Sequence, residues 1–123
     1  MESKHAILAF SALAQPTRLE VFRLLIAHEP DGLPAGEIAR YMGVPHNTMS
    51  AHLAILTRAG LIGADRQSRS IIYRAKLEAI RELAGFLVKD CCGGRPEICV
   101  PLTADLSRHC PPKSTTRKET LRG

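Results

Sequence analysis

Residues 35–62 read AGEIARYMGVPHNTMSAHLAILTRAGLI, and this stretch decides the fold. Its first part predicts a short helix over residues 35–41, which Gly43 ends. After a turn, residues 46–59 predict a second, longer helix. Two helices separated by about four residues that include a glycine have the spacing of a helix-turn-helix.

The second helix is expected to run from His46 or Asn47 to Arg58. Its apolar residues recur at three- and four-residue spacing and form an inward stripe of Met49, Leu53 and Leu56, with Ile55 nearby. In a helix-turn-helix, the N-terminal half of this helix turns polar side chains toward base edges in the major groove. The residues expected to meet DNA are His46, Asn47, Thr48, Ser50, Ala51 and His52.

Further helices and a hairpin are expected around this pair. The helices cover residues 4–14, a segment that begins at Pro16, and residues 77–90. Residues 61–64 and 70–74 are typical of short strands around a polar tip at residues 65–69. The pattern therefore predicts a mainly α fold with a small β-hairpin, arranged as a winged helix-turn-helix.

The basic residues gather in two places. The chain has a formal net charge of +5, and residues 62–76 hold four bases against Asp65 alone. Residues 108–123 form a second basic segment. Within the hairpin, Arg66 and Arg69 are expected to hold the DNA backbone or to enter the minor groove.

Two simpler interpretations stay open. The amphipathic helix and the charged hairpin also suit a plain helical domain with a solvated hairpin. His52 is as well explained by packing on the helix surface as by DNA contact. The order of the elements favours DNA binding, because each one has the length that a winged helix-turn-helix requires.

The composition bears on the compartment. No apolar run reaches the roughly 18 residues that a membrane span needs, and residues 1–4 do not open a long hydrophobic signal segment. We therefore expect a cytoplasmic protein without membrane contact. Thiols are kept reduced there, so the cysteines favour a metal, metalloid or redox site over a disulfide framework.

The chain resembles the ArsR/SmtB family of metal-responsive bacterial repressors. The resemblance rests on LAQPTRLEVFRLL at residues 13–25, on EIARYMGVPHNTMSAHLAILTRAGLI at residues 37–62 and on IIYR at residues 71–74, and it covers roughly residues 5–90. It implies a homodimer joined through the first and last helices, bound to a roughly palindromic double-stranded operator. The implied interface residues are Ile7, Leu8, Phe10, Leu83, Leu87 and Val88.

The family resemblance also bears on the inducer site. Arsenic-sensing relatives often carry cysteines on the helix before the recognition helix, but residues 33–42 contain none. Cys91, Cys92 and Cys99 instead look like the C-terminal three-cysteine site of another arsenic-responsive subgroup. Three thiolates match As(III) or Sb(III) in charge and in trigonal pyramidal shape.

Other interpretations of the cysteines remain open. Cys110, with His109 as a possible substitute, would complete a four-ligand Zn(II) or Cd(II) site. A thiol redox switch and buried inert cysteines are further alternatives. An enzyme is not expected, because Arg95 follows Cys91 and Cys92 too closely for a phosphate-cradling loop and no Ser/His/acid set occurs.

The expected function combines these features. Residues 1–92 would form the DNA-binding and dimerisation domain, and residues 93–123 a cysteine-containing loop and a flexible basic tail. The protein would repress by binding operator DNA in its apo state. As(III), with Sb(III) as the alternative, would release it by binding Cys91, Cys92 and Cys99.

Overall fold

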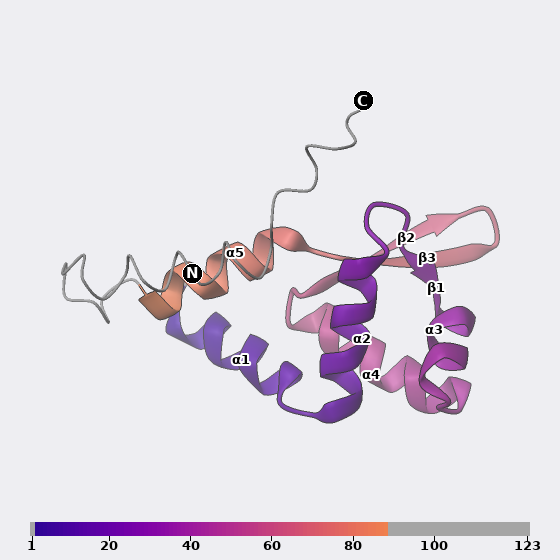
Figure 1. The fold of residues 1–123 in the computed structure, drawn as a ribbon, viewed down its shortest axis with the longest axis horizontal. Coiled ribbons are helices and arrows are strands. Elements are labelled where there is room, and N and C mark those ends of the chain that lie inside the picture. The colour runs from indigo at the N-terminus through magenta and orange to yellow at the C-terminus, as the bar shows by residue number, and fades with distance from the viewer. Residues whose placement is uncertain (1, 89–123) are drawn as a thin grey trace. The chain divides into compact units, whose positions relative to one another are not determined.

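The computed structural model of the chain describes residues 2–88. They form helices α1 (Ser3–Leu13), α2 (Pro16–Ala27), α3 (Ala35–Met42), α4 (His46–Arg58) and α5 (Leu77–Val88), with strands β1 (Leu33–Pro34), β2 (Ile62–Gln67) and β3 (Ser70–Ala75) (Figure 1). The predicted winged helix-turn-helix architecture is confirmed. The chain divides into two compact units after Phe86, and the hydrophobic core lies within the first unit. The predicted boundary between residues 92 and 93 lies outside the described residues.

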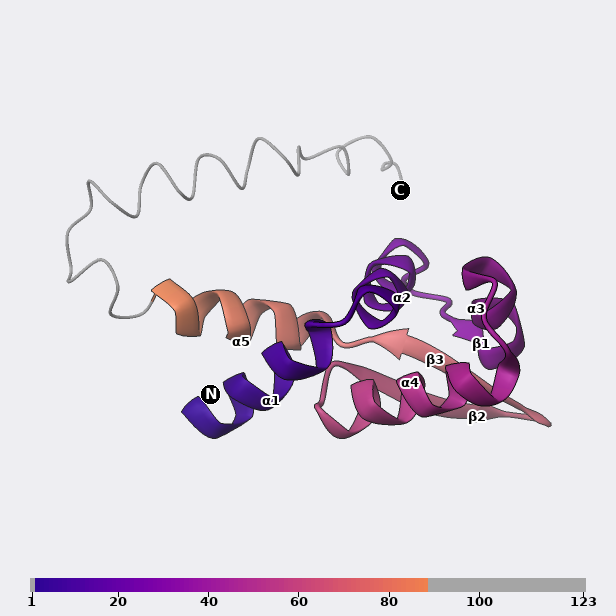
Figure 2. The ribbon, with the colours of Figure 1, turned by 90° about the horizontal axis from the view of Figure 1, so that it is seen from below.

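The turn between α3 and α4 is built as the sequence predicts. Gly43 has a φ of 65°, in the left-handed region that a residue without Cβ adopts at little cost. Its N–H donates to the Arg40 carbonyl at 3.3 Å, and the Val44 N–H donates to the Ala39 carbonyl at 3.1 Å. These bonds satisfy the end of α3 and bring its C-terminus to the start of α4 (Figure 2).

The hydrophobic core is aliphatic and small-residue rich. It collects buried side chains from every helix and from the base of the hairpin: Ala6, Ala9, Ala12, Val21, Phe22, Leu25, Ile38, Ala39, Met49, Leu53, Leu56, Leu61, Ile62, Ala75, Ala79 and Leu83. The inward stripe predicted for α4 is confirmed, because its three members are at most 1% exposed. Burying each of them stabilises the fold by about 1.5–3 kcal/mol.

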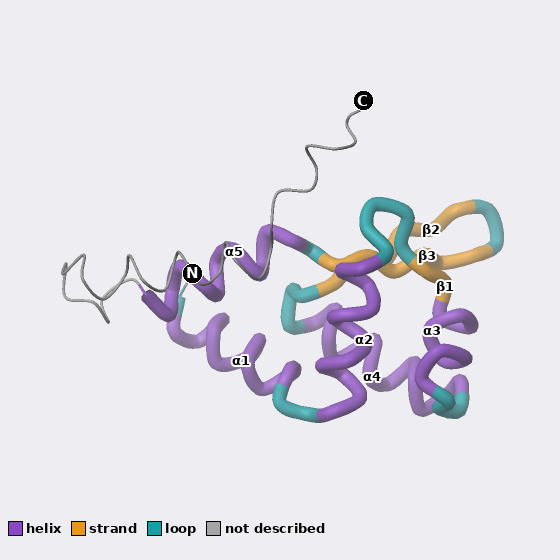
Figure 3. Tube along the Cα trace, viewed as in Figure 1, coloured by secondary structure: helices purple, strands orange, loops and turns teal. Residues whose placement is uncertain are grey.

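The sheet differs from the prediction in two ways (Figure 3). Strands β2 and β3 pair in antiparallel register from Ile62 opposite Ala75 to Gln67 opposite Ser70, so the polar stretch predicted as a tip is mostly paired strand. Both faces of this ribbon's outer part meet solvent, where polar residues cost nothing. Only Ser68 and Arg69 remain in the turn. Strand β1, which the sequence did not reveal, adds to the other edge of β3 and gives the order β1-β3-β2.

The outer faces of α1 and α5 carry exposed apolar side chains. On α1, Ile7 is 67% exposed and Leu8 46%, whereas Phe10 is partly buried against the core. On α5, Leu77 and Ile80 are exposed. Leu83, which the family resemblance implied as an interface residue, is instead 6% exposed and packs with Ala79 in the core of its own chain. Leu87 and Val88 belong to the second unit.

Among residues 2–88, no helix combines the length and the apolar character that crossing a membrane requires.

Candidate nucleic-acid interface

The polar face of α4 is turned away from the core. His46, Asn47, Thr48, Ser50 and Ala51 are exposed, and His52 is half-buried. The stripe of Met49, Leu53 and Leu56 on the opposite side fixes how the helix is rotated about its axis. The residues of α4 that are predicted to meet DNA therefore lie outside the core, and the packing of the stripe holds them in a single orientation.

The first turn of α4 has a feature that the sequence did not reveal. Pro45 offers no side-chain cap, and the first intrahelical bond runs from the Met49 N–H to the Pro45 carbonyl at 2.9 Å. The Thr48 N–H, which lacks an intrahelical acceptor, donates instead to Asn47 Oδ1 at 3.0 Å. The Asn47 amide group stays free to donate. Because a carboxamide oxygen has two lone pairs, Asn47 Oδ1 can accept from adenine as well as from the Thr48 N–H.

His52 lies one turn after Thr48 on α4. Its Nδ1 atom is buried and has no hydrogen-bond partner among the described residues. The ring is therefore partly packed and partly at the surface. The two interpretations of His52, packing and DNA contact, are both compatible with this placement.

The two hairpin arginines that are predicted to meet DNA lie in different parts of the hairpin. Arg66 on β2 and Arg69 in the turn are both exposed. Neither forms an ion pair within residues 2–88, whereas Arg74 lies 3.9 Å from Asp65. That contact is long and solvent-exposed, so it contributes little stability. The views in Figure 1 and Figure 2 place the hairpin tip at the end of the first unit where α4 begins.

Helix α3 adds two exposed donors that the sequence reasoning missed. Arg40 pairs with Glu37 at 2.7 Å, and Tyr41 is 58% exposed and makes a T-shaped ring contact with His28. The first helix of a helix-turn-helix crosses the DNA backbone, where guanidinium and phenol groups donate to phosphates. The sequence signal that could have revealed these donors is the polar end of residues 35–41, next to the turn.

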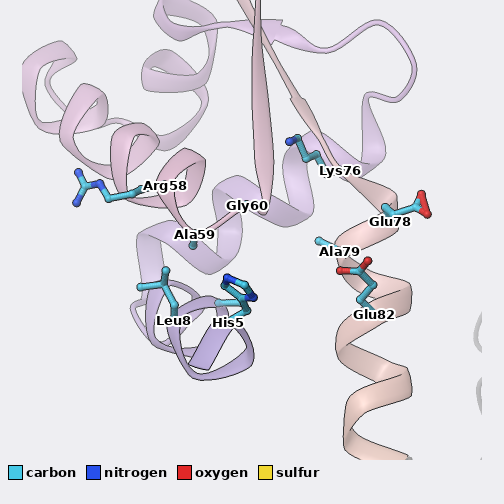
Figure 4. Close-up of a pocket in the computed structure, with 10 residues that line it drawn as sticks. His5, Leu8, Arg58, Ala59, Gly60, Lys76, Glu78, Ala79 and Glu82 are labelled. Carbon is cyan, nitrogen blue, oxygen red and sulfur yellow. The ribbon is translucent and has the colours of Figure 1, made fainter. Parts of the chain in front are cut away.

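A cleft of about 420 Å³ lies at the opposite end of α4 (Figure 4). Its walls come from α1, from the turn after α4 and from the start of α5: His5, Leu8, Ala9, Arg58, Ala59, Gly60, Lys76, Glu78, Ala79 and Glu82. Glu78 is paired with Arg81 at 2.8 Å. Because Leu8 is one of the exposed apolar residues of α1, the cleft is continuous with that face.

The metalloid prediction cannot be placed on this geometry. Cys91, Cys92, Cys99 and Cys110 lie outside the described residues. Within residues 2–88, no group of three His, Cys, Asp or Glu side chains is arranged to hold a metal ion.

Comparison with known proteins agrees with the interface. A family model described as a helix-turn-helix domain matches residues 13–62. The HTH-type transcriptional regulator YgaV of Escherichia coli is 30% identical over 90 residues, which cover 73% of this chain and 89% of the relative.

Two solved structures are also similar. One is a homodimeric winged helix-turn-helix DNA-binding domain from Mycobacterium bovis, described as a possible ArsR-family regulator; it is 26% identical, with a TM-score of 0.59, over 73% of this chain and 82% of the other. The second is a possible transcriptional regulator for arsenical resistance, 25% identical with a TM-score of 0.56 over 64% of this chain and 79% of the other. The exposed polar face of α4, the basic hairpin and these relatives agree: the chain is a regulator rather than an enzyme, and it belongs to the HTH-type transcriptional regulators, with a winged helix-turn-helix of the ArsR/SmtB type.

Proposed function

We propose that the protein is a homodimeric repressor that binds operator DNA in its apo state and is released when As(III) or Sb(III) binds Cys91, Cys92 and Cys99. The observation that carries the DNA-binding part is the polar face of α4, which three buried side chains hold outward. Asn47, Thr48 and Ser50 supply selectivity on this face. Arg66 and Arg69 supply contacts with phosphates or with the minor groove.

Dimerisation is supported by the apolar residues that α1 and α5 leave exposed. Ile7 and Leu8 on α1, together with Leu77 and Ile80 on α5, are large apolar side chains that are 36–67% exposed. Covering them with a second copy removes apolar surface from water. The homodimeric relative from Mycobacterium bovis supports the same arrangement. Two copies of α4 would then read a roughly palindromic operator.

The dimer can be tested without DNA. Ile7→Glu would place a charge in the proposed interface and should shift the molar mass measured by light scattering from dimer to monomer. Ile71→Glu is the matched control, because Ile71 is an exposed isoleucine of the hairpin. A dimer that survives Ile7→Glu unchanged would contradict this interface.

The metalloid part rests on the chemistry of the cysteines and on their place in the sequence. Three thiolates suit a trivalent, sulfur-loving centre, and they would be reduced in the cytoplasm, where the protein is proposed to act. Cys91 follows Val88, the last described residue of α5, by three positions. A ligand there would act beside a helix of the proposed interface. Coupling of about 1–3 kcal/mol would already change DNA affinity severalfold to a hundredfold.

An arsenite titration tests this part. Duplexes that bind the wild-type chain are first selected from a pool with a random central segment, and arsenite is then added to the complex under reducing conditions. We expect the DNA to be released with one As(III) bound per chain. Undiminished binding at saturating arsenite would contradict the proposal.

Two cysteine variants distinguish a three-thiolate metalloid site from a four-ligand metal site. Cys99→Ser should abolish the arsenite response, and Cys110→Ser should leave it intact. If Cys110→Ser is the damaging change and Zn(II) or Cd(II) is the effective ligand, the four-ligand metal site replaces the metalloid site. A response to oxidant alone, reversed by a thiol reductant, would favour the redox switch.

A further inference from the structure

The ring of His52 is half-buried, at the border between the core side of α4 and its polar face. Its Nδ1 atom is enclosed and unpartnered among the described residues. The other ring nitrogen, Nε2, is not among the enclosed unpartnered atoms and takes part in no hydrogen bond within residues 2–88, so it reaches the surface. The two nitrogens of one imidazole therefore meet different surroundings.

This difference selects one neutral tautomer. A neutral imidazole carries a proton on one nitrogen and a lone pair on the other. With the proton on Nδ1, the ring would bury an N–H donor that no acceptor satisfies, and such orphaned donors are rare in folded proteins. With the proton on Nε2, the donor meets solvent, and only a lone pair is enclosed. The surroundings of His52 thus favour Nε2–H.

We propose that His52 uses Nε2–H as a single hydrogen-bond donor to an acceptor on DNA, either a phosphate oxygen or an acceptor on a base edge such as purine N7. The proposal rests on the DNA-binding function proposed above and gives His52 a definite role within it. Thr48 lies one turn earlier on the same side of α4, at a spacing that makes the two residues neighbours. Asn47 both donates and accepts, whereas His52 only donates.

The tautomer is tested on the free full-length chain. Long-range correlation of ring protons with ring nitrogens by NMR distinguishes a protonated nitrogen from an unprotonated one. We expect the neutral ring of His52 to carry its proton on Nε2. A spectrum with the proton on Nδ1 would overturn the assignment, and this measurement needs no variant to fold.

The contact with DNA is tested by three variants of one position. The amide nitrogen of glutamine can occupy the place of Nε2, whereas that of asparagine lies near the place of Nδ1. We expect H52N and H52A to weaken binding to the selected duplexes roughly tenfold, as for the loss of one hydrogen bond, and H52Q to weaken it less. H52N binding as well as H52Q, or H52A binding as well as wild type, would overturn the proposal.

The same variants separate the two sources of the acceptor. Repeating the selection with H52A would relax the preference at one position of each half-site if His52 contacts a base. It would weaken all sequences equally if His52 contacts a phosphate. Either result supports a donor at His52. A wild-type chain that binds no duplex from the pool would instead refute the proposed function, while the NMR measurement would still stand.

Discussion

Helix α4 and the β2–β3 hairpin are both proposed to meet DNA, yet they are held to the protein in opposite ways. Helix α4 is anchored along its length by the buried side chains of Met49, Leu53 and Leu56. The buried residues of the hairpin, Ile62 and Ala75, are both at its base, and residues 64–71 are all exposed. Reading a base edge requires side chains held in a fixed position, whereas contact with a phosphate requires only charge and reach.

The distribution of charge follows the same division. Arg58, at the end of α4 that lines the cleft, is the only Lys or Arg of that helix. At the DNA end, Arg66 and Arg69 of the hairpin are exposed and form no ion pair within residues 2–88, whereas the exposed Arg40 of α3 is paired with Glu37. Affinity should therefore depend mainly on the hairpin and selectivity mainly on α4.

The largest expected effect comes from removing the support under α4. Leu53→Ala deletes a side chain that is 1% exposed and leaves a cavity, so it should lower the free energy of unfolding by about 2–5 kcal/mol. Urea unfolding of the purified chain measures this. Ala54→Ser, at the exposed neighbouring position, is the control and should change stability by less than about 0.5 kcal/mol. A loss below 1 kcal/mol at Leu53, on the order of a surface change, would mean that packing does not hold the helix.

A smaller loss of stability is expected at Gly32, where the segment before β1 lies against β3. Gly32 has a φ of 75°, and an added Cβ would lie 2.5 Å from both the Tyr73 carbonyl oxygen and Arg74 Cγ. Gly32→Ala should therefore destabilise the chain by about 1–3 kcal/mol, measured by the same unfolding. Gly36→Ala is the matched control, because its Cβ would meet nothing within 4 Å, inside helix α3. Equal effects of the two substitutions would show that the edge of the sheet does not depend on this close approach.

The smallest effect is expected at the tip of the hairpin. Ser68 has a φ of 57° in the two-residue turn, a conformation that glycine adopts more readily. Ser68→Gly relieves backbone strain in the folded turn but gives the unfolded chain more conformational freedom. The net effect should raise the free energy of unfolding by about 0.5 kcal/mol. DNA affinity should stay the same, because Arg66 and Arg69 are retained. A loss of affinity on this change would mean that the tip must be rigid to bind.

The elements with a strong sequence pattern were predicted correctly, and those with a weak pattern were not. The stripe on α4 and the stop at Gly43 are repeated or conformationally unusual features, and both were predicted correctly. The hairpin tip was placed wrongly because polar residues such as Asp65 and Arg66 suit an exposed paired strand as well as a loop. Strand β1 is two residues long and includes Pro34, so it leaves no pattern to detect.

The sequence predicted which residues of α4 lie on its polar face, but it did not predict their hydrogen bonds. The residues of the polar face follow from the helical period, which places them opposite Met49 and Leu53. The bond from the Thr48 N–H to Asn47 Oδ1 depends on the lack of a cap at Pro45, and the enclosure of His52 Nδ1 depends on neighbours distant in the sequence. The inner position of Leu83 likewise depends on how α5 is rotated against the core. The cysteines remain a prediction.

The division between α4 and the hairpin is tested most directly by comparing Asn47→Ala with Arg66→Ala. Each variant is used to select duplexes from the random pool, and its affinity is measured across a range of salt concentrations. We expect Asn47→Ala to relax the preferred sequence and to leave the salt dependence unchanged. Arg66→Ala should weaken all sequences and reduce the slope of log affinity against log salt by about 1. The same uniform loss on every sequence from both variants would contradict the account.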